Sequence, residues 1–409
     1  MSASILVPGT LRIGAGACLC LPDVLNQFGL KHPLIVTDPV VIEFGYLERV
    51  TEPLSAAGVN FGVFCDVPAE PCTTTVAASL EMLKSADYDC VVGLGGGSAM
   101  DTAKALSVVG AHGGKVRDYA VPAVINTPGL PIIAIPTTAG TGSEATKVTI
   151  VTDAENGEKM LCMGRAFMPS AALVDYQVTM TMPYRLTADT GIDSMTHAIE
   201  AYVSRKANMY SDTLALAAMK LIFNNIRVAC NEPDNAKARE AMMLGATQGG
   251  MAFSNASVAL VHGMSRPIGA HFHVPHGLSN AMLLPAVCAF SLPAAQERYA
   301  DCARQMGMVP ADADDSTANR VLLEELRRLN QDLKVPSPET YGIDRAAYMD
   351  LIPTMAEQAL ASGSPANNPL IASTDEIKAL YKEIYSQADS SALVQTGTFR
   401  KIPEHKVTA

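Results

Sequence analysis

The sequence predicts a protein of two domains, a doubly wound α/β domain followed by a helical one. Short apolar runs alternate with helical periods over the first third of the chain, a pattern typical of a parallel sheet with helices on both faces. After about residue 180 the strand signals vanish, and long helical patterns rich in Ala, Met and Leu follow. A chain of 409 residues is also too long for one ordinary core.

The α/β domain is expected to span residues 1–180 and to alternate strands with helices. Strands are predicted at 34–37, 61–65, 90–94 and 131–135, and helices at 41–57, at 73–86 and directly after the glycine turn 95–97. Residues 146–163 break this rhythm and indicate two strands around a turn at Asn156-Gly157. A last short strand is predicted at 172–175.

The helical domain is expected to span residues 181–386. Its predicted helices lie at 187–204, 209–230, 236–253, 257–270, 276–290, 293–306, 316–332, 345–360 and 374–386. Residues 387–409 are polar and carry little periodicity, which indicates a C-terminal extension.

Composition and charge exclude several classes of function. With 48% hydrophobic and 17% charged residues, the chain is typical of a globular protein. The net charge of −11 argues against nucleic-acid and anionic-membrane partners, because no basic face is available to neutralise phosphates. The nine cysteines are scattered without a C-x-x-C pair, as expected of reduced thiols. Since neither a signal peptide nor a transmembrane run is evident, we expect a soluble, cytoplasmic protein.

Two polar loops indicate a nucleotide site in the α/β domain. The segment GLGGGS at 93–98 follows a strand and opens a helix, so backbone N–H groups could face a diphosphate there. Because Ser98 occupies the last glycine position of G-x-G-x-x-G, a turn without a ligand explains this loop about as well. The second loop, PTTAGTGSE at 136–144, places hydroxyls and glycines directly beyond a strand, which favours phosphate and ribose contacts over a merely solvated loop.

Asp38 ends the strand 34–37 and bears on the choice of nucleotide. A carboxylate there could accept hydrogen bonds from adenosine ribose hydroxyls and would repel a 2′-phosphate. NAD is therefore favoured over NADP, although an aspartate at the end of a strand is more often only a cap.

A divalent metal site is indicated by an acidic and imidazole pair in a helical pattern. Asp193 and His197 lie four residues apart, so both side chains project from nearly one helix face. Such a pair can share an ion, although a salt-bridged or capping pair is more common. Glu200, one turn after His197, is a further possible ligand, but a solvated helix face is the simpler interpretation.

Four histidines follow in one glycine-interrupted segment, at His262, His271, His273 and His276. With the helical pair, two of them would complete an oxygen and nitrogen donor set that suits Fe²⁺ or Zn²⁺ and not Mg²⁺ or Ca²⁺. His271 and His273 alternate, so they could flank a short extended piece, with one of them as a proton relay. Spacing alone leaves open which histidines bind the metal.

Several longer motifs join these signals into one series. They are GGGS at 95–98 with Met100-Asp101, PTTAGTGSE at 136–144, GIDSMTHAIEAYVS at 191–204, GMAFSNASVALVHGMS at 250–265 and VPHGLSNAMLLP at 274–285. Running in order over roughly residues 5–385, this series resembles the iron-containing (group III) alcohol dehydrogenase family. The resemblance implies a dinucleotide-binding α/β domain, a helical metal domain and an active site in the cleft between them.

The resemblance also implies roles for individual residues. It selects His262 and His276, which with Asp193 and His197 match the family's metal positions, and Phe253 matches a position that faces the substrate in relatives. The residues implied for the cofactor are Asp38, Gly95, Gly96, Gly97, Ser98, Asp101, Thr137, Thr138, Thr141 and Ser143, with Lys159 and the segment from Val178 to Met182 as further wall.

Arg266 departs from the family pattern, because relatives often carry a second histidine there as a candidate proton relay. His271 or His273 could replace it in that role. Alternatively, Arg266 points into the pocket and favours an acidic substrate, such as a carboxylate- or phosphonate-bearing aldehyde, with a surface or structural arginine as the simpler interpretation. The extension beyond residue 386 is a second departure.

The resemblance implies reversible, NAD(H)-linked interconversion of a small primary alcohol, diol or hydroxy acid and its aldehyde, with Fe²⁺ or Zn²⁺ polarising the substrate oxygen. A homodimer or larger homo-oligomer is expected. The alternatives are a zinc glycerol dehydrogenase, a dehydroquinate-synthase-like lyase and a catalytically silent nucleotide-binding protein. The PTTAGTGSE and GIDSMTHAIEAYVS motifs disfavour the first two, and the intact set of four ligand positions argues against the third.

Overall fold

The structure is a computed structural model that describes residues 2–386. The extension predicted at 387–409 lies outside the described residues. By compactness the chain divides into two units, one holding residues 2–201 and 207–256 and the other holding 202–206 and 257–386. The boundary predicted near residue 180 coincides instead with the change from strands to helices, so the extents of the two domains stay a prediction.

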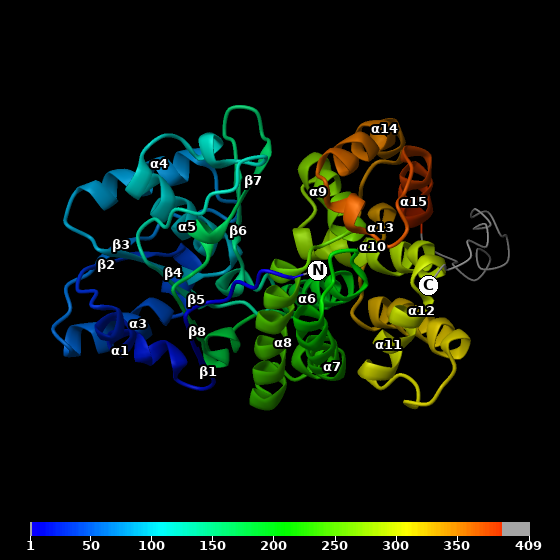
Figure 1. The fold of residues 1–409 in the computed structure, drawn as a ribbon, viewed down its shortest axis with the longest axis horizontal. Coiled ribbons are helices and arrows are strands. Elements are labelled where there is room, and N and C mark those ends of the chain that lie inside the picture. Colours follow the sequence, from blue (N-terminus) through cyan, green and yellow to red (C-terminus); the bar gives the residue numbers. More distant parts are fainter. Residues whose placement is uncertain (1, 387–409) are drawn as a thin grey trace. The chain divides into compact units, whose positions relative to one another are not determined.

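A six-stranded parallel sheet forms the centre of the first unit (Figure 1). Its strands are β1 (Thr10–Ile13), β2 (Pro33–Val36), β3 (Gly62–Phe64), β4 (Cys90–Gly95), β5 (Ile132–Pro136) and β8 (Ala171–Val174). Their order is β1-β8-β5-β4-β2-β3, and each neighbouring pair is parallel. The predicted parallel α/β sheet is confirmed, and β1 is a strand that the apolar pattern did not indicate.

Helices cover both faces of this sheet. They are α1 (Leu21–Phe28), α2 (Pro39–Glu43), α3 (Tyr46–Ala56), α4 (Thr73–Lys84) and α5 (Gly97–His112). Successive strand residues point to opposite faces, so Ile35 and Val92 pack with α1 and α3, whereas Leu34 and Val91 pack with α4 and α5. Figure 1 shows α1 and α3 on one side of the strands and α4 and α5 on the other.

The single helix predicted at 41–57 is wrong, because α2 and α3 are separate helices. Gly45, at the N-cap of α3, has a φ of 71°. This left-handed conformation is accessible to glycine and ends the first helix before the second begins.

An antiparallel hairpin follows the sheet strands β4 and β5. It pairs β6 (Val148–Thr152) with β7 (Lys159–Met163), and its turn contains Gly157 with a φ of 74°. The inward residues Val151, Met160 and Cys162 pack in a core with Val108 of α5. The hairpin predicted from the Asn156-Gly157 turn is therefore confirmed.

The rest of the described chain is helical. Its long helices are α6 (Tyr184–Val203), α7 (Met209–Asn231), α8 (Ala236–Asn255), α9 (Leu260–Phe272), α10 (His276–Ser291), α11 (Gln296–Met306), α12 (Asp315–Asp332), α14 (Arg345–Ala361) and α15 (Thr374–Ser386). Each predicted helical segment is a helix, α13 (Pro338–Tyr341) is an additional short one, and residues 175–386 contain no strand.

Two helical segments, 209–231 and 276–294, are long and apolar enough to cross a membrane by length and composition alone. A core helix passes the same test, and the most apolar window of the second segment is 72% buried. This is weak evidence for a membrane span.

Candidate metal and nucleotide sites

The carboxyl ends of β2 and β4 mark the point where the strand order of the sheet reverses. From β2 the chain moves outward to β3, whereas from β4 it continues to β5 on the opposite side. Ligands of open α/β sheets bind outside the strands at such a point. Asp38 follows β2, and the glycine turn follows β4, so both lie at this position.

The glycine turn lets these two strand ends approach each other. Gly95 has a φ of 150°, and a Cβ built on it would lie 2.7 Å from Ala99 Cβ and 2.9 Å from Asp38 Oδ2. A Cβ on Gly97 would lie 3.0 Å from Thr141 Cγ2 of the second polar loop. Larger residues would push apart the groups that the sequence assigned to the nucleotide.

A cavity of about 620 Å³ lies at this edge of the sheet. Its volume is within the range of small-molecule sites. The predicted cofactor residues that line it are Asp38, Gly96, Ser98, Thr137, Thr138, Val178 and Met182. Apolar side chains, among them Val41 and Leu186, complete the wall. Residues of both polar loops and of the segment from Val178 to Met182 therefore line one cavity.

Asp38 is both a wall residue and a helix cap. Its Oδ1 accepts hydrogen bonds from the backbone N–H groups of Val40 and Val41, at 3.0 and 3.1 Å. Its Oδ2 is the oxygen that faces Gly95. The capping role weighed from the sequence is thus present, and it fixes the carboxylate at the cavity.

The remaining predicted cofactor residues do not line this cavity. They are Gly95, Gly97, Asp101, Thr141, Ser143 and Lys159. The Ser143 hydroxyl donates to Asp101 Oδ1 at 3.0 Å in the protein interior. Lys159 forms an ion pair with Glu70, with 2.6 Å between Nζ and Oε1. Asp101 and Ser143 thus bond to each other, and Lys159 pairs with Glu70, and none of these four residues lines the cavity.

Helix α6 carries the first half of the candidate metal site. Asp193 and His197 are both buried, and His197 Nε2 lies 3.8 Å from Asp193 Oδ1, as the i, i+4 spacing predicted. The ring of Phe253 on α8 stacks on the His197 ring, with centroids 4.4 Å apart. Close packing positions α6, because a Cβ on Gly191 would lie 2.7 Å from Ile226 of α7.

The second polar loop also touches α6. Ser194, next to Asp193, donates from Oγ to the carbonyl oxygen of Gly140 at 2.6 Å. A Cβ on Gly140 would lie 2.5 Å from Thr190 Cβ, so the loop backbone lies directly against the helix. The loop that lines the nucleotide cavity is therefore packed against the helix that bears Asp193 and His197.

Helices α9 and α10 carry the second half of the candidate metal site. His262 is buried on α9, and His276 begins α10, with 5.4 Å between the ring centroids. The Asn280 amide Nδ2 lies 3.2 Å from His262 Nε2 and 3.3 Å from His276 Nε2. Sequence reasoning missed Asn280, although its place one turn after His276 was a usable signal.

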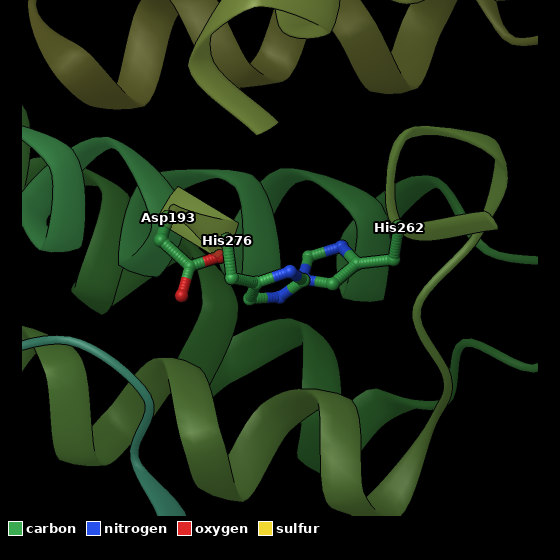
Figure 2. Close-up of side chains that lie close together, drawn as sticks. All are labelled: Asp193, His262 and His276. Carbon is green, nitrogen blue, oxygen red and sulfur yellow. The ribbon is translucent and has the colours of Figure 1, made fainter. Parts of the chain in front are cut away.

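Figure 2 shows the side chains of Asp193, His262 and His276 close together. One potential ligand atom from each residue lies within 4.8 Å of the other two. Among the described residues these three form the group of acidic, histidine or cysteine side chains placed to hold a metal ion. His262 and His276 are also the two histidines that the family resemblance selected, and their role as ligands stays a prediction.

His271 and His273 are placed differently. His271 Nε2 lies 2.8 Å from Gln358 Oε1 on α14, and His273 is exposed, with a φ of 54°, where α9 ends. The short extended piece expected at 271–273 is wrong, because α9 continues to Phe272 and closes with a left-handed residue. Neither histidine joins the group of Figure 2.

The structure also places Glu200, a possible metal ligand, and Arg266, a possible substrate contact. Glu200 is 3% exposed, so the solvated helix face considered for it is wrong, and it is absent from the group of potential ligands. Arg266 is half-buried on α9, one helical turn after His262 and on the same helix face.

Comparison with known proteins places these features in one family. The family model "Iron-containing alcohol dehydrogenase" matches residues 8–176, and the model "Fe-containing alcohol dehydrogenase family, C-terminal" matches residues 187–385. Together the two models cover both candidate sites.

Individual relatives match over nearly the whole chain. Long-chain-alcohol dehydrogenase 1 of Geobacillus thermodenitrificans (strain NG80-2) is 36% identical over 94% of this chain and 97% of its own. A crystal structure of 1,3-propanediol oxidoreductase superimposes with a TM-score of 0.90 at 32% identity, covering 94% of this chain and 100% of that one. Sulfoacetaldehyde reductase from Bifidobacterium kashiwanohense, in complex with NAD⁺, superimposes with a TM-score of 0.85 at 28% identity, covering 94% and 99%.

Proposed function

The chain belongs to the iron-containing alcohol dehydrogenase family, and from this premise we propose that it reversibly oxidises a small primary alcohol, diol or hydroxy acid to its aldehyde with NAD and Fe²⁺. Membership makes the protein an oxidoreductase of alcohols and aldehydes. The observation that carries the finer proposal is the approach of one carboxylate and two imidazoles to within 4.8 Å.

These donors fit iron or zinc. His197, whose ring lies 3.8 Å from Asp193, would add a third imidazole to the group. One oxygen and three nitrogen donors suit Fe²⁺ or Zn²⁺, whereas Mg²⁺ and Ca²⁺ prefer oxygen alone. We therefore propose Asp193, His197, His262 and His276 as the ligands, with Fe²⁺ favoured by the family and Zn²⁺ as the alternative. When bound, the ion would supply Lewis acidity toward the substrate oxygen.

The protein's own contribution is position and shielding. Phe253 covers one face of the His197 ring and so fixes the orientation of that imidazole while excluding water from it. Asn280 contacts both His262 and His276 and restricts their rotation in the same way. The loop 136–144 joins the cavity wall to α6, so the cofactor loop and two proposed metal ligands share one rigid support.

We propose that the cavity of about 620 Å³ binds NAD, whose nicotinamide would supply or accept the hydride. The backbone of the glycine turn and the N-terminus of α5 would face the diphosphate. Asp38 lines the cavity, and its capping bonds hold the carboxylate in place. Because a fixed negative charge repels a 2′-phosphate, NAD is preferred to NADP.

Arg266 suggests the chemical class of the substrate. It lies on the same face of α9 as His262, one turn further along. A guanidinium stays charged at every physiological pH and pairs with carboxylate, sulfonate or phosphonate groups through two N–H donors. The structurally similar sulfoacetaldehyde reductase is named for such an anionic aldehyde. We propose that this chain likewise acts on an aldehyde that bears an anionic group.

We propose a cytoplasmic, homodimeric or larger assembly. All nine cysteines are free thiols, which is typical of proteins from a reducing compartment. The homo-oligomer rests on the family alone, and light scattering coupled to size-exclusion chromatography would measure it. A monomer at working concentrations would contradict the assembly without affecting the reaction.

One experiment tests the proposed reaction. Protein purified without oxygen is analysed for bound metals and then assayed with a panel of neutral and anionic aldehydes, using NADH and NADPH separately. We expect close to one iron per chain, NADH preferred to NADPH, and oxidation of cofactor that depends on the aldehyde. Absence of iron and zinc together with absence of NADH turnover across the panel would contradict the proposal.

A further inference from the structure

Lys104 is a buried lysine on α5, two turns after the glycine turn, with no exposed surface. Its ammonium lies within donor distance of four oxygens: Ser143 Oγ at 2.9 Å, both Thr146 O and Thr146 Oγ1 at 3.0 Å, and Val148 O at 2.9 Å. All four belong to residues 143–148, which overlap the C-terminal end of the polar loop 136–144. One side chain thus ties that loop's C-terminal end to α5.

Asp101, one turn earlier on α5, bonds to the same segment and to β6. Its Oδ1 accepts from the Ser143 hydroxyl at 3.0 Å, and its Oδ2 accepts from the backbone N–H of Ile150 at 2.9 Å. The Ser143 hydroxyl therefore donates to Asp101 and accepts from Lys104. Asp101 and Lys104 both lie on α5, so together they hold the Ser143 hydroxyl in one position.

Glu144 extends the network to α8. Its Oε1 accepts from the Thr247 hydroxyl at 2.6 Å, and the residue is 2% exposed. Burial raises the pKa of both Asp101 and Glu144, and it lowers the pKa of Lys104 to about 8 although the two carboxylates act in the opposite direction. Burying a charged side chain costs free energy unless the charge is paired. An apolar residue at position 104 would avoid this cost, so the buried lysine indicates that its hydrogen-bond donors have a role.

We infer that Lys104 is a positioning residue for the dinucleotide: it holds the polar loop so that Thr137 and Thr138 line the cofactor cavity. The inference rests on the proposed NAD site. Thr138 Oγ1 lies 3.6 Å from the position of a Cβ on Gly96, so small movements of the loop change the distance between the two cofactor loops. Lys104 acts from behind this surface, because it has no exposed atoms with which to touch a ligand.

The test is NADH affinity in the Lys104→Met variant, which keeps the length of the side chain and removes its donors. Fluorescence titration of the metal-loaded protein with NADH is expected to give a Kd raised at least about tenfold, the loss of roughly one charge-assisted hydrogen bond. Turnover at saturating NADH is expected to stay within about threefold of wild type, because the chemical groups remain in place.

Two further variants separate positioning from general stability. Thr146→Val removes one acceptor of Lys104 at a site that is 1% exposed, and it is expected to weaken NADH binding in the same direction. Ser107→Ala is the matched control, because Ser107 lies on the same helix and donates at 2.6 Å to Leu130 O, outside the polar loop. It is expected to lower Tm while leaving the Kd for NADH unchanged.

The double variant Asp101→Asn with Lys104→Met tests whether charge balance alone matters. It removes the acid closest in sequence to the lost cation, so Tm is expected to recover in part, whereas NADH binding stays weak. Recovery of both Tm and affinity would overturn the inference, as would a Lys104→Met variant that binds NADH as tightly as wild type. A wild-type protein that binds no NADH would instead contradict the proposed function.

Discussion

Asn280 is a residue whose place in the candidate site depends on the fold. Its amide contacts the rings of both His262 and His276, from a position with no exposed surface. These two contacts restrict the rotation of both rings, which we propose as metal ligands. In the sequence, Asn280 is one asparagine in a helical pattern, and its contact with His262 requires that α9 and α10 lie side by side.

The proposed metal ligands make a direct prediction at this scale. His262→Ala or His276→Ala removes one imidazole, so metal affinity is expected to fall at least about 100-fold, more than the loss of an outer contact. Aldehyde reduction is expected to fall with it. Metal analysis after dialysis, with circular dichroism to confirm folding, measures the effect.

His112→Ala is the matched control for these variants. The His112 ring bonds to the carbonyl oxygens of Thr127 and Pro128 in the α/β domain, so its loss leaves the proposed donors intact. Full metal content in His262→Ala would contradict the ligand assignment, and metal loss in His112→Ala would show that the assay reports damage to the fold.

Arg266 carries the prediction on substrate class. If its guanidinium pairs with an anionic group, Arg266→Gln is expected to lower kcat/KM for anionic aldehydes about 10- to 100-fold, the value of a charge-assisted pair. The kcat/KM for neutral aldehydes of the same length is expected to stay unchanged. An equal loss for both classes would indicate a structural arginine instead.

Sequence alone predicted part of this site, and the physical reason differs from residue to residue. Asp193 and His197 followed from helical spacing, since four residues return a side chain to the same face. The choice among His262, His271, His273 and His276 depended on the family motifs. One helix ends and another begins between His262 and His276, so helical spacing cannot relate the two side chains. His271 bonds to Gln358, which is 87 positions away in the sequence, and no local pattern predicts such a contact.

The elements differ in how well the sequence indicated them. Strands β2, β4 and β5 are buried on both faces and appear as continuous apolar runs, so they were predicted. Strand β1 lies at the sheet edge, with its last two residues exposed, and its sequence TLRI carries a charge. An edge strand pairs on one side only, so its sequence needs no apolar run.

Glycines on α8 show how an element positions the cofactor loop. Gly142 has a φ of 61°, and a Cβ on Gly250 would lie 2.6 Å from Gly142 O. Gly250→Ala is therefore expected to push the loop from α8, with a loss of about 1–3 kcal/mol in stability and weaker NADH binding. Thermal unfolding and NADH titration measure the two effects separately.

Gly245→Ala provides the comparison on the same helix. A Cβ there would lie 2.7 Å from Ile222 Cγ1 of α7, so it crowds the helix pair and not the polar loop. It is expected to lower stability while leaving the Kd for NADH unchanged. If both variants weaken NADH binding equally, α8 acts through general packing and not through its contact with Gly142.

At the scale of the molecule, the helical half illustrates a limit of pattern reasoning. Helices α6, α7 and α8 were assigned by composition to the second domain, whereas compactness groups most of their residues with the sheet, and the extents of the domains stay a prediction. Periodicity identifies a helix and its apolar face, but it does not say which core that face joins. Ser194 of α6 bonds to Gly140 of the polar loop, and Thr247 of α8 bonds to Glu144 of the same loop. Both contacts join residues far apart in the sequence, so no local pattern predicts them.

Metal binding is expected to stabilise the whole fold, because the proposed ligands come from three helices, α6, α9 and α10, spread over 84 residues from Asp193 to His276. Unfolding separates these ligands, so the metal binds the native state and not the unfolded one. At a free metal concentration 100 times its Kd, binding stabilises the native state by about 2.7 kcal/mol. Chelation is therefore expected to lower Tm, and added Fe²⁺ or Zn²⁺ to restore it. In His262→Ala the same additions are expected to leave Tm nearly unchanged, since the site lacks a donor. Equal stabilisation of wild type and variant would place the ion elsewhere on the protein.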